Sequence, residues 1–175
     1  VMDKRFLIKD SAFYYKGTKY RIELAIDLDS EIANQTQLYY TRIESVLNKC
    51  LLQALSDEDP EAALGQILSY VGRTFSCDRS YIFEIDGDYA NNTYEWCDPS
   101  AAPQREILQN LPVSSIRWGL DLLEKNELLV IRDLEEIRAR HPSAYALLKP
   151  QKIECLIAGP VLLDGRLVGF FGMDN

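Results

Sequence analysis

The sequence predicts an α+β fold in which a central antiparallel sheet carries helices on its faces, and three observations support this prediction. The chain ends in two apolar runs joined by a turn dipeptide. N-terminal to these runs, strand-like runs are separated by segments with helical spacing. A long stretch without glycine or proline lies N-terminal to all of these segments. Strands and helices that cover each other's apolar faces build one domain of this class. We expect a short β segment and a long helix to precede the sheet.

The terminal stretch, residues 151–175, is predicted to form a β-hairpin. Ile153, Cys155 and Ile157 alternate with further apolar residues, so both faces of the first strand are apolar. A strand of this kind must be covered on both sides, which places it in the interior of a sheet. Asp164 and Gly165 tolerate the positive φ angles of a two-residue turn, and the return strand is predicted over 166–173.

This hairpin resembles the end of a GAF domain. The resemblance rests on residues 151–160, QKIECLIAGP, and 164–175, DGRLVGFFGMDN, and residues 91–97, NNTYEWC, resemble the same bacterial signalling subgroup. Most such domains carry serine where this chain has Cys155. The resemblance covers residues 57–175 and implies a GAF-like antiparallel sheet. It departs from the family at one point, because the helix that usually closes these domains does not follow before Asn175.

Within residues 57–175 the elements are predicted in order. An acidic cluster around Pro60 supplies the cap and first turn of a helix whose apolar face runs to Phe75. Strands are predicted over 79–86 and 93–97, and a polar excursion then ends in a short helix over 116–123. A strand over 128–131 and a helix from Pro142 to Pro150 lead into the hairpin.

Residues 1–29 are predicted to form short β segments over 6–9, 11–15 and 18–27. In the last segment apolar and polar residues alternate, as in a strand buried on one face. Residues 20–29, YRIELAIDLD, resemble the final strand of a PAS domain with its acidic exit, which implies that the chain begins inside a neighbouring domain. A strand pair that packs on the main sheet is the alternative.

Residues 30–56 are predicted to form a linker helix. Asp29 and Ser30 provide a cap signal, and the apolar spacing then alternates between four and three residues. Such a seam is typical of a parallel coiled coil, so we expect a homodimer through residues 32–50. A helix that folds back onto its own sheet is the alternative. The seam residues are Ile32, Thr36, Tyr39, Ile43, Val46 and Cys50.

Composition limits the classes of function. The chain has 175 residues, of which 47% are hydrophobic, and a net charge of −8, which disfavours nucleic-acid binding. No apolar run approaches the ~20 residues that span a bilayer and no signal-peptide pattern is present, so we expect no membrane contact. Four widely spaced cysteines favour a reduced cytoplasmic setting. The single histidine, His141, cannot assemble a typical transition-metal site, so no metal is expected.

The GAF resemblance implies a small-molecule pocket between one sheet face and a lid formed by the excursion and the helix before the hairpin. Aromatic residues with one polar tip suit such a pocket, although core packing is the alternative for each of them. The Asn-Lys-Phe-Asp-Glu set of cyclic-nucleotide sites is absent, and neither bilin nor haem is favoured, so the ligand stays unknown. The candidate wall residues are Tyr81, Phe83, Trp96, Trp118, Tyr145, Cys155 and Ile157.

Three functions remain open at this point. The first is a regulatory sensor that passes its ligand state through the linker helix to an output domain beyond Asn175, of the diguanylate cyclase or histidine kinase type. The second is a non-catalytic dimerisation scaffold with a filled pocket. The third is a GAF-fold methionine sulfoxide reductase, for which Cys97 and Cys155 must lie within disulfide reach in an electropositive setting. No other catalytic constellation can be assembled, so the fragment is expected not to be an enzyme.

Overall fold

The computed structural model describes residues 6–15, 18–27, 43–46, 48–50, 52 and 59–175, which belong to two compact units, Val1–Pro60 and Glu61–Asn175. In the first unit β1 (Phe6–Tyr15) pairs antiparallel with β2 (Thr18–Asp27). The predicted strands are confirmed, with one correction. The segments expected over 6–9 and 11–15 form a single strand, because every residue from Phe6 to Tyr15 has a partner in β2.

Part of the predicted linker helix is described. Residues 43–46, 48–50 and 52 are helical, and the seam residues Ile43, Val46 and Cys50 are buried. Leu52, outside the seam, is 65% exposed. The other seam residues, Ile32, Thr36 and Tyr39, lie outside the described residues.

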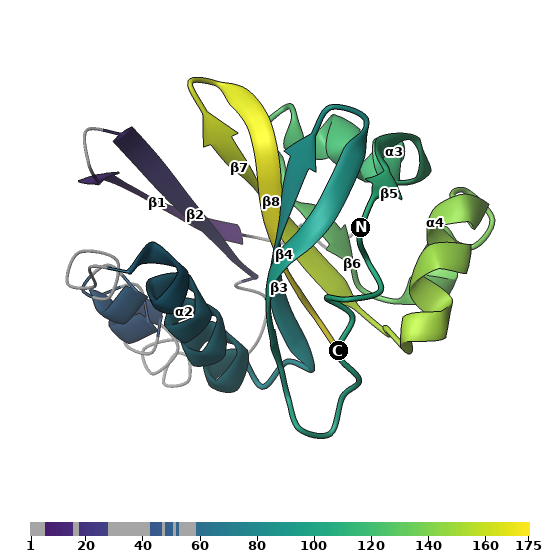
Figure 1. Cartoon of the computed structure of the whole chain (residues 1–175), viewed down its shortest axis with the longest axis horizontal. Helices are drawn as coiled ribbons and strands as arrows, with labels where there is room; N and C mark the ends of the chain where they lie inside the picture. Colours follow the sequence, from purple (N-terminus) through teal and green to yellow (C-terminus); the bar gives the residue numbers. More distant parts are fainter. Residues whose placement is uncertain (1–5, 16–17, 28–42, 47, 51, 53–58) are drawn as a thin grey trace. The chain divides into compact units, whose positions relative to one another are not determined.

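The second unit is built on a six-stranded antiparallel sheet with strand order β5-β4-β3-β8-β7-β6 (Figure 1). The hairpin strands β7 and β8 sit inside the sheet, because β7 pairs with β6 and β8 pairs with β3. The predicted GAF-like α+β fold is confirmed. The strand bounds are β3 (Arg79–Asp86), β4 (Tyr89–Cys97), β5 (Leu111–Pro112), β6 (Leu129–Ile131), β7 (Leu156–Leu163) and β8 (Arg166–Asp174).

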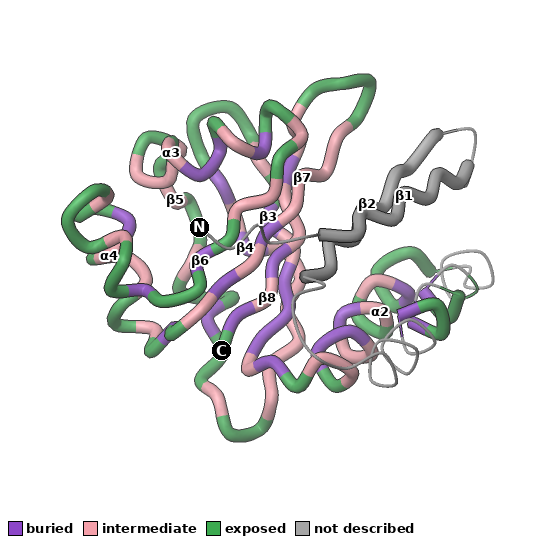
Figure 2. The backbone as a smooth tube through the Cα atoms, turned by 180° about the vertical axis from the view of Figure 1, so that it is seen from behind, coloured by how far each residue is buried: buried purple, intermediate pink, exposed green. Residues whose placement is uncertain are grey.

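Helices cover both faces of this sheet. On one face α2 (Pro60–Phe75) packs through Leu68, whose carbonyl accepts a hydrogen bond of 2.8 Å from the Ser80 hydroxyl. The other face carries α3 (Val113–Leu123) and α4 (Pro142–Leu148), with the 3-10 turns η1 (Leu134–Ile137) and η2 (Lys149–Gln151) beside α4. Buried residues gather in the strands and on the inner sides of the helices (Figure 2). No helix in the described part of the chain is long and apolar enough to cross a membrane.

The turn of the hairpin forms as its sequence predicts. Asp164 and Gly165 have φ angles of 52° and 76°, so both central turn residues lie in the left-handed region that suits a tight hairpin. The start of the hairpin differs from the prediction. Strand β7 begins at Leu156, because Glu154 and Cys155 instead donate their backbone N–H groups to the Asn175 carbonyl.

Two glycines of α2 provide a matched test of this packing. A Cβ at Gly72 would lie 2.1 Å from the Trp96 ring, whereas a Cβ at the exposed Gly65 would meet nothing within 4 Å. We expect Gly72→Ala to lower the free energy of unfolding by about 1–3 kcal/mol through overpacking, and Gly65→Ala to raise it by about 1 kcal/mol through helix propensity. Chemical denaturation measures both changes. Equal effects of the two substitutions would contradict the close approach of Trp96.

Candidate functional site

Successive side chains of β3 point to opposite faces of the sheet. Ser80 faces α2, whereas Tyr81 and Phe83 face α3 and α4, because successive strand residues point to opposite sides. Trp96 lies opposite Ser80 in the β3–β4 register, and its ring packs at Gly72 of α2. Trp96, a predicted wall residue, therefore lies on the α2 side of the sheet.

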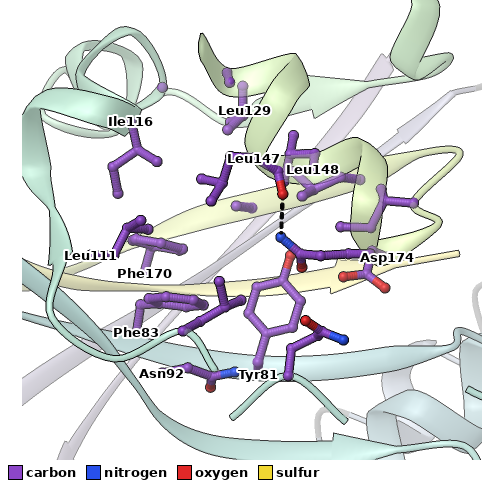
Figure 3. Close-up of a pocket in the computed structure, with 18 of the residues that line it drawn as sticks. Tyr81, Phe83, Asn92, Leu111, Ile116, Leu129, Leu147, Leu148, Phe170 and Asp174 are labelled. Atoms are coloured by element: carbon purple, nitrogen blue, oxygen red, sulfur yellow. Dashed lines mark hydrogen bonds between the residues drawn. The ribbon is translucent and has the colours of Figure 1, made fainter. Parts of the chain in front are cut away.

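A cavity of about 80 Å³ lies between the sheet and the lid helices α3 and α4 (Figure 3). Its floor is aromatic. The rings of Phe83 and Phe170 stack with centroids 4.8 Å apart, and Tyr81 meets Phe83 edge-on at 5.6 Å. The lid contributes aliphatic side chains from α3, β6 and α4, among them Ile116, Leu120, Leu129, Leu147 and Leu148.

Three of the seven predicted wall residues, Tyr81, Phe83 and Trp118, line this cavity, and the other four do not. Ile157 is on the wrong face because Leu156 and Ala158, its neighbours in β7, are the residues that face the cavity. Cys155 precedes β7 and is also outside the lining.

Tyr145 points away from the cavity. Its hydroxyl donates a hydrogen bond of 2.8 Å to Glu135 Oε1, and Arg138 and Lys149 lie over its ring at 5.5 and 5.7 Å. The inner side of α4 instead presents Ala144 to the cavity. Tyr145 thus holds α4 to η1 rather than forming a wall of the pocket.

The polar end of the cavity is built on a buried ion pair. Arg79, at the start of β3, donates from Nε to Asp174 Oδ1 at 2.9 Å, and Asp174 ends β8. The two side chains are only 3% and 1% exposed. The guanidinium also donates to the backbone carbonyls of Ala102 and Gln151, at 3.0 and 3.1 Å. One side chain therefore ties β8 to both ends of the lid.

Burial changes the acidity of the groups around this pair. It raises the pKa of Asp174 to about 6, although Arg79 favours the ionised carboxylate. Burial also raises the pKa of Tyr81 well above its ordinary value, and the nearby Asp174 adds to this rise. Tyr81 thus keeps its proton at neutral pH, and its hydroxyl is directed toward the lid (Figure 3).

A β-bulge brings Asn92 and Glu95 to the same face of β4. Ile82 pairs with Tyr94 and Phe83 pairs with Asn92, so Thr93 is the extra residue. Asn92 Nδ2 donates to Glu95 Oε1 at 3.1 Å, and the Glu95 carboxylate accepts the backbone N–H groups of Gln104 and Arg105. Both side chains line the cavity. Asn92 Oδ1 is buried and has no hydrogen-bond partner.

The His141 side chain packs within the lid. His141 is the N-cap residue of α4, but its side chain makes no capping hydrogen bond and instead stacks on Trp118 of α3 with ring centroids 4.3 Å apart. This stack connects the two lid helices, and Trp118 is the partner that also touches the cavity. Among the described residues, no group of three or more histidine, cysteine or acidic side chains is placed to hold a metal ion.

The cysteines differ in their surroundings, and all four are free thiols. The Cys97 thiol donates to the carbonyls of Asp98 and Ala101, and burial followed by the charge of Glu95 raises its pKa. A catalytic thiol needs the opposite shift, because the thiolate is the nucleophile.

Sequence reasoning missed the polar residues of the site, namely Arg79, Asn92, Glu95 and Asp174. One signal was present, since Asp174 belongs to the Gly-Met-Asp-Asn ending of the GAF resemblance and Arg79 is a charged residue next to a buried strand. Their contact follows from the β3–β8 register, which pairs Arg79 with Asp174. That register cannot be obtained from either segment alone.

A mostly apolar cavity between a curled antiparallel sheet and a helical lid is the arrangement of a binding module. The family model for the GAF domain matches residues 59–175, and the chain therefore belongs to the GAF family. It is 30% identical over 130 residues to the methanogenesis regulatory histidine kinase FilI of Methanothrix harundinacea. That match covers 69% of this chain and only 14% of the kinase.

Solved structures share the fold at low sequence identity. The chromophore-binding domain of Stigmatella aurantiaca phytochrome P1 has a TM-score of 0.64 at 16% identity, over 96% of this chain and 60% of that one. A phycocyanobilin-bound GAF domain from a cyanobacterial phytochrome has a TM-score of 0.62 at 17% identity, over 75% and 79%. The PixJ GAF domain of Thermosynechococcus elongatus has a TM-score of 0.56 at 15% identity, over 66% and 68%.

The raised pKa of Asp174 predicts a pH dependence of stability. Between its ordinary pKa of 3.8 and the value of about 6 in the folded protein, the folded state holds a proton that the unfolded state has released. The contribution of this group to stability is therefore complete below about pH 4 and is lost as the pH rises through 6.

We expect the difference in unfolding free energy between the wild type and Asp174→Asn to shrink by up to about 3 kcal/mol from pH 4 to pH 7. Denaturant titrations at several pH values measure this difference. Asp86→Asn, at an exposed position at the other end of β3, is the control. A difference that grows with pH would show that Arg79 lowers the Asp174 pKa more than burial raises it.

Proposed function

We propose that this GAF domain is the sensor module of a larger signalling protein and that a small molecule bound in the cavity is its signal. The cavity carries the proposal, because it is mostly apolar and is lined by Asn92, whose Oδ1 is buried and has no hydrogen-bond partner. An apolar pocket with a few directed polar groups is the usual form of a small-molecule site. The relationship to a regulatory histidine kinase supports a regulatory role.

The lid provides the means to report occupancy. Arg79 contacts Ala102 and Gln151, which lie at opposite ends of the lid, and Trp118 joins α3 to α4 through His141. A ligand that contacts these side chains is therefore coupled to both parts of the lid. For binding to act as a signal, the ligand must have unequal affinity for the two lid positions.

The wider architecture is also a proposal. Residues 1–29 would be the end of a PAS-like domain, residues 30–56 a dimeric signalling helix, and the GAF domain would relay to an output of the histidine kinase or diguanylate cyclase type in the cytoplasm. The kinase FilI, of which this chain spans a small part, favours the kinase output. A helix that folds back onto its own sheet stays the alternative to the dimeric helix, and the subunit count distinguishes the two.

The scaffold alternative differs from the sensor in one respect, because it needs no ligand in the cavity. The reductase alternative is disfavoured by the raised pKa of Cys97, which keeps this thiol protonated at neutral pH. We therefore propose a module that binds its ligand without chemical turnover.

A native mass spectrum of the purified protein tests the sensor directly. Ala144→Leu fills the cavity from α4, and Ala146→Leu makes the same change on the exposed side of that helix. We expect a dimer that carries additional small-molecule mass in the wild type and in Ala146→Leu, and loss of that mass in Ala144→Leu. Overpacking by the larger side chain costs about 1–3 kcal/mol, so circular dichroism confirms that Ala144→Leu is folded.

A dimer without extra mass in any variant would favour the scaffold. A bare monomer would also remove the coiled-coil proposal for residues 32–50. Extra mass retained in Ala144→Leu would place the ligand outside the cavity.

A further inference from the structure

We propose that the ligand is a small uncharged molecule that donates a hydrogen bond to Asn92 Oδ1 and lays an apolar body against Phe83 and Phe170. This inference rests on the proposed function, because it concerns the same cavity. Three properties of the cavity support it, namely an acceptor without a donor, charges that are already paired, and a small volume.

The unpartnered acceptor is fixed in orientation. Asn92 is 1% exposed, and its Nδ2 donates to Glu95 Oε1 at 3.1 Å. The opposite orientation of the amide would place its oxygen against the Glu95 carboxylate. The hydrogen bond therefore assigns Nδ2 to Glu95 and leaves Oδ1 as the atom without a partner. The remaining atom, Oδ1, is buried without a partner. A buried unpaired polar atom costs about 1–3 kcal/mol, and a ligand O–H or N–H would recover that cost.

The neighbouring polar groups do not supply the missing donor. The Gln109 side chain donates to the Asn92 carbonyl and to the Arg105 carbonyl instead of to Oδ1. The Asn92 backbone N–H is itself used, because it donates to the Leu108 carbonyl at 3.0 Å. The backbone and the side-chain nitrogen of Asn92 are therefore satisfied within the protein, and the side-chain oxygen alone is left for a ligand.

The charged side chains that line the cavity are already hydrogen-bonded within the protein. Arg79 donates to Asp174 and to two backbone carbonyls, and Glu95 accepts from Asn92 and from two backbone N–H groups. An anionic ligand would find the guanidinium, and a cationic ligand the two carboxylates, already committed to other partners. Burying a charge without a partner is far more costly than burying a hydroxyl or amide, so an uncharged ligand is favoured.

The shape of the cavity favours a small ligand. The cavity measures about 80 Å³ and is partly open, so a short chain can enter it and extend toward the opening. A molecule with a short chain or one small ring matches this space. Its polar group would lie at the Asn92 side, and its apolar part would contact the stacked rings of Phe83 and Phe170.

Four probes with the same four-carbon chain test the inference. They are 1-butanol, 1-fluorobutane, butylammonium and butyrate. Only 1-butanol is an uncharged donor. Binding is followed by the fluorescence of Trp118 in a Trp96→Phe variant, and a Trp118→Phe variant, whose remaining tryptophan lies on the α2 side of the sheet, is the control.

We expect 1-butanol to bind at least about tenfold more tightly than 1-fluorobutane, which is about 1.4 kcal/mol, and neither ion to bind. In Asn92→Leu this preference is expected to disappear. The matched control is Asn91→Leu, since Asn91 is the preceding residue of β4, is not part of the lining, and accepts instead from the Asn110 backbone N–H. This control should keep the preference.

Equal affinities for 1-butanol and 1-fluorobutane would overturn the donor requirement and leave the sensor proposal standing. Tighter binding of butylammonium or butyrate would overturn the uncharged class. Absence of binding by all four probes would overturn the inference, and the native mass spectrum would then decide separately whether the cavity holds a ligand. If Asn92→Leu does not fold, the ratio measured in the Trp96→Phe protein still decides the donor requirement.

Discussion

The buried ion pair between Arg79 and Asp174 is the interaction on which the rest of the domain depends. It joins the first residue of β3 to the last residue of β8. The same guanidinium also donates hydrogen bonds to the backbone carbonyls of Ala102 and Gln151. Loss of one partner from a buried pair leaves an uncompensated charge and costs about 3–5 kcal/mol. The pair is therefore more important for arranging the lid over the sheet than for adding net stability, since its own desolvation offsets much of its attraction.

The elements of the domain could be predicted from local sequence patterns. The Asp164-Gly165 turn has the positive φ angles that its residue types favour, and α2 begins at Pro60 as the helix-start pattern indicates. Both depend on short-range steric preferences, which a single segment contains in full. The interior position of β7 also follows from its composition, because only a strand covered on both faces tolerates apolar residues on both.

The faces of the strands were harder to predict. Trp96 would share a face with Tyr81 if it lay opposite Tyr81 or another residue of that face, such as Phe83, but it lies opposite Ser80. The bulge at Thr93 then places Asn92 and Glu95 on one face although they are three residues apart. A shift of one residue exchanges the two faces of a strand, and the sequence pattern around β4 and β7 does not determine that shift.

The site also depends on contacts between distant segments, which explains why its polar residues were not found. Arg79 and Asp174 are 95 positions apart in the chain. Taken alone, each is a charged residue at the end of a strand, where charged residues are usually exposed to solvent. The β3–β8 register brings the two residues together, and the contacts of Arg79 then hold the lid over the cavity. The sequence therefore predicted the aromatic floor, represented by Tyr81 and Phe83, but not the polar end of the cavity.

The same ion pair connects the size of the ligand to the stability of the domain. Structural neighbours include a phycocyanobilin-bound GAF domain, but a likeness at 17% identity extends to the fold alone. In this chain the lid lies close enough to the sheet to leave about 80 Å³. A much larger ligand could be fully buried only if the lid lifted, and this movement would break the contacts of Arg79 with Ala102 and Gln151 while the guanidinium stays buried. A small ligand can occupy the cavity with these contacts intact, so the arrangement of Arg79 itself favours the small-ligand proposal.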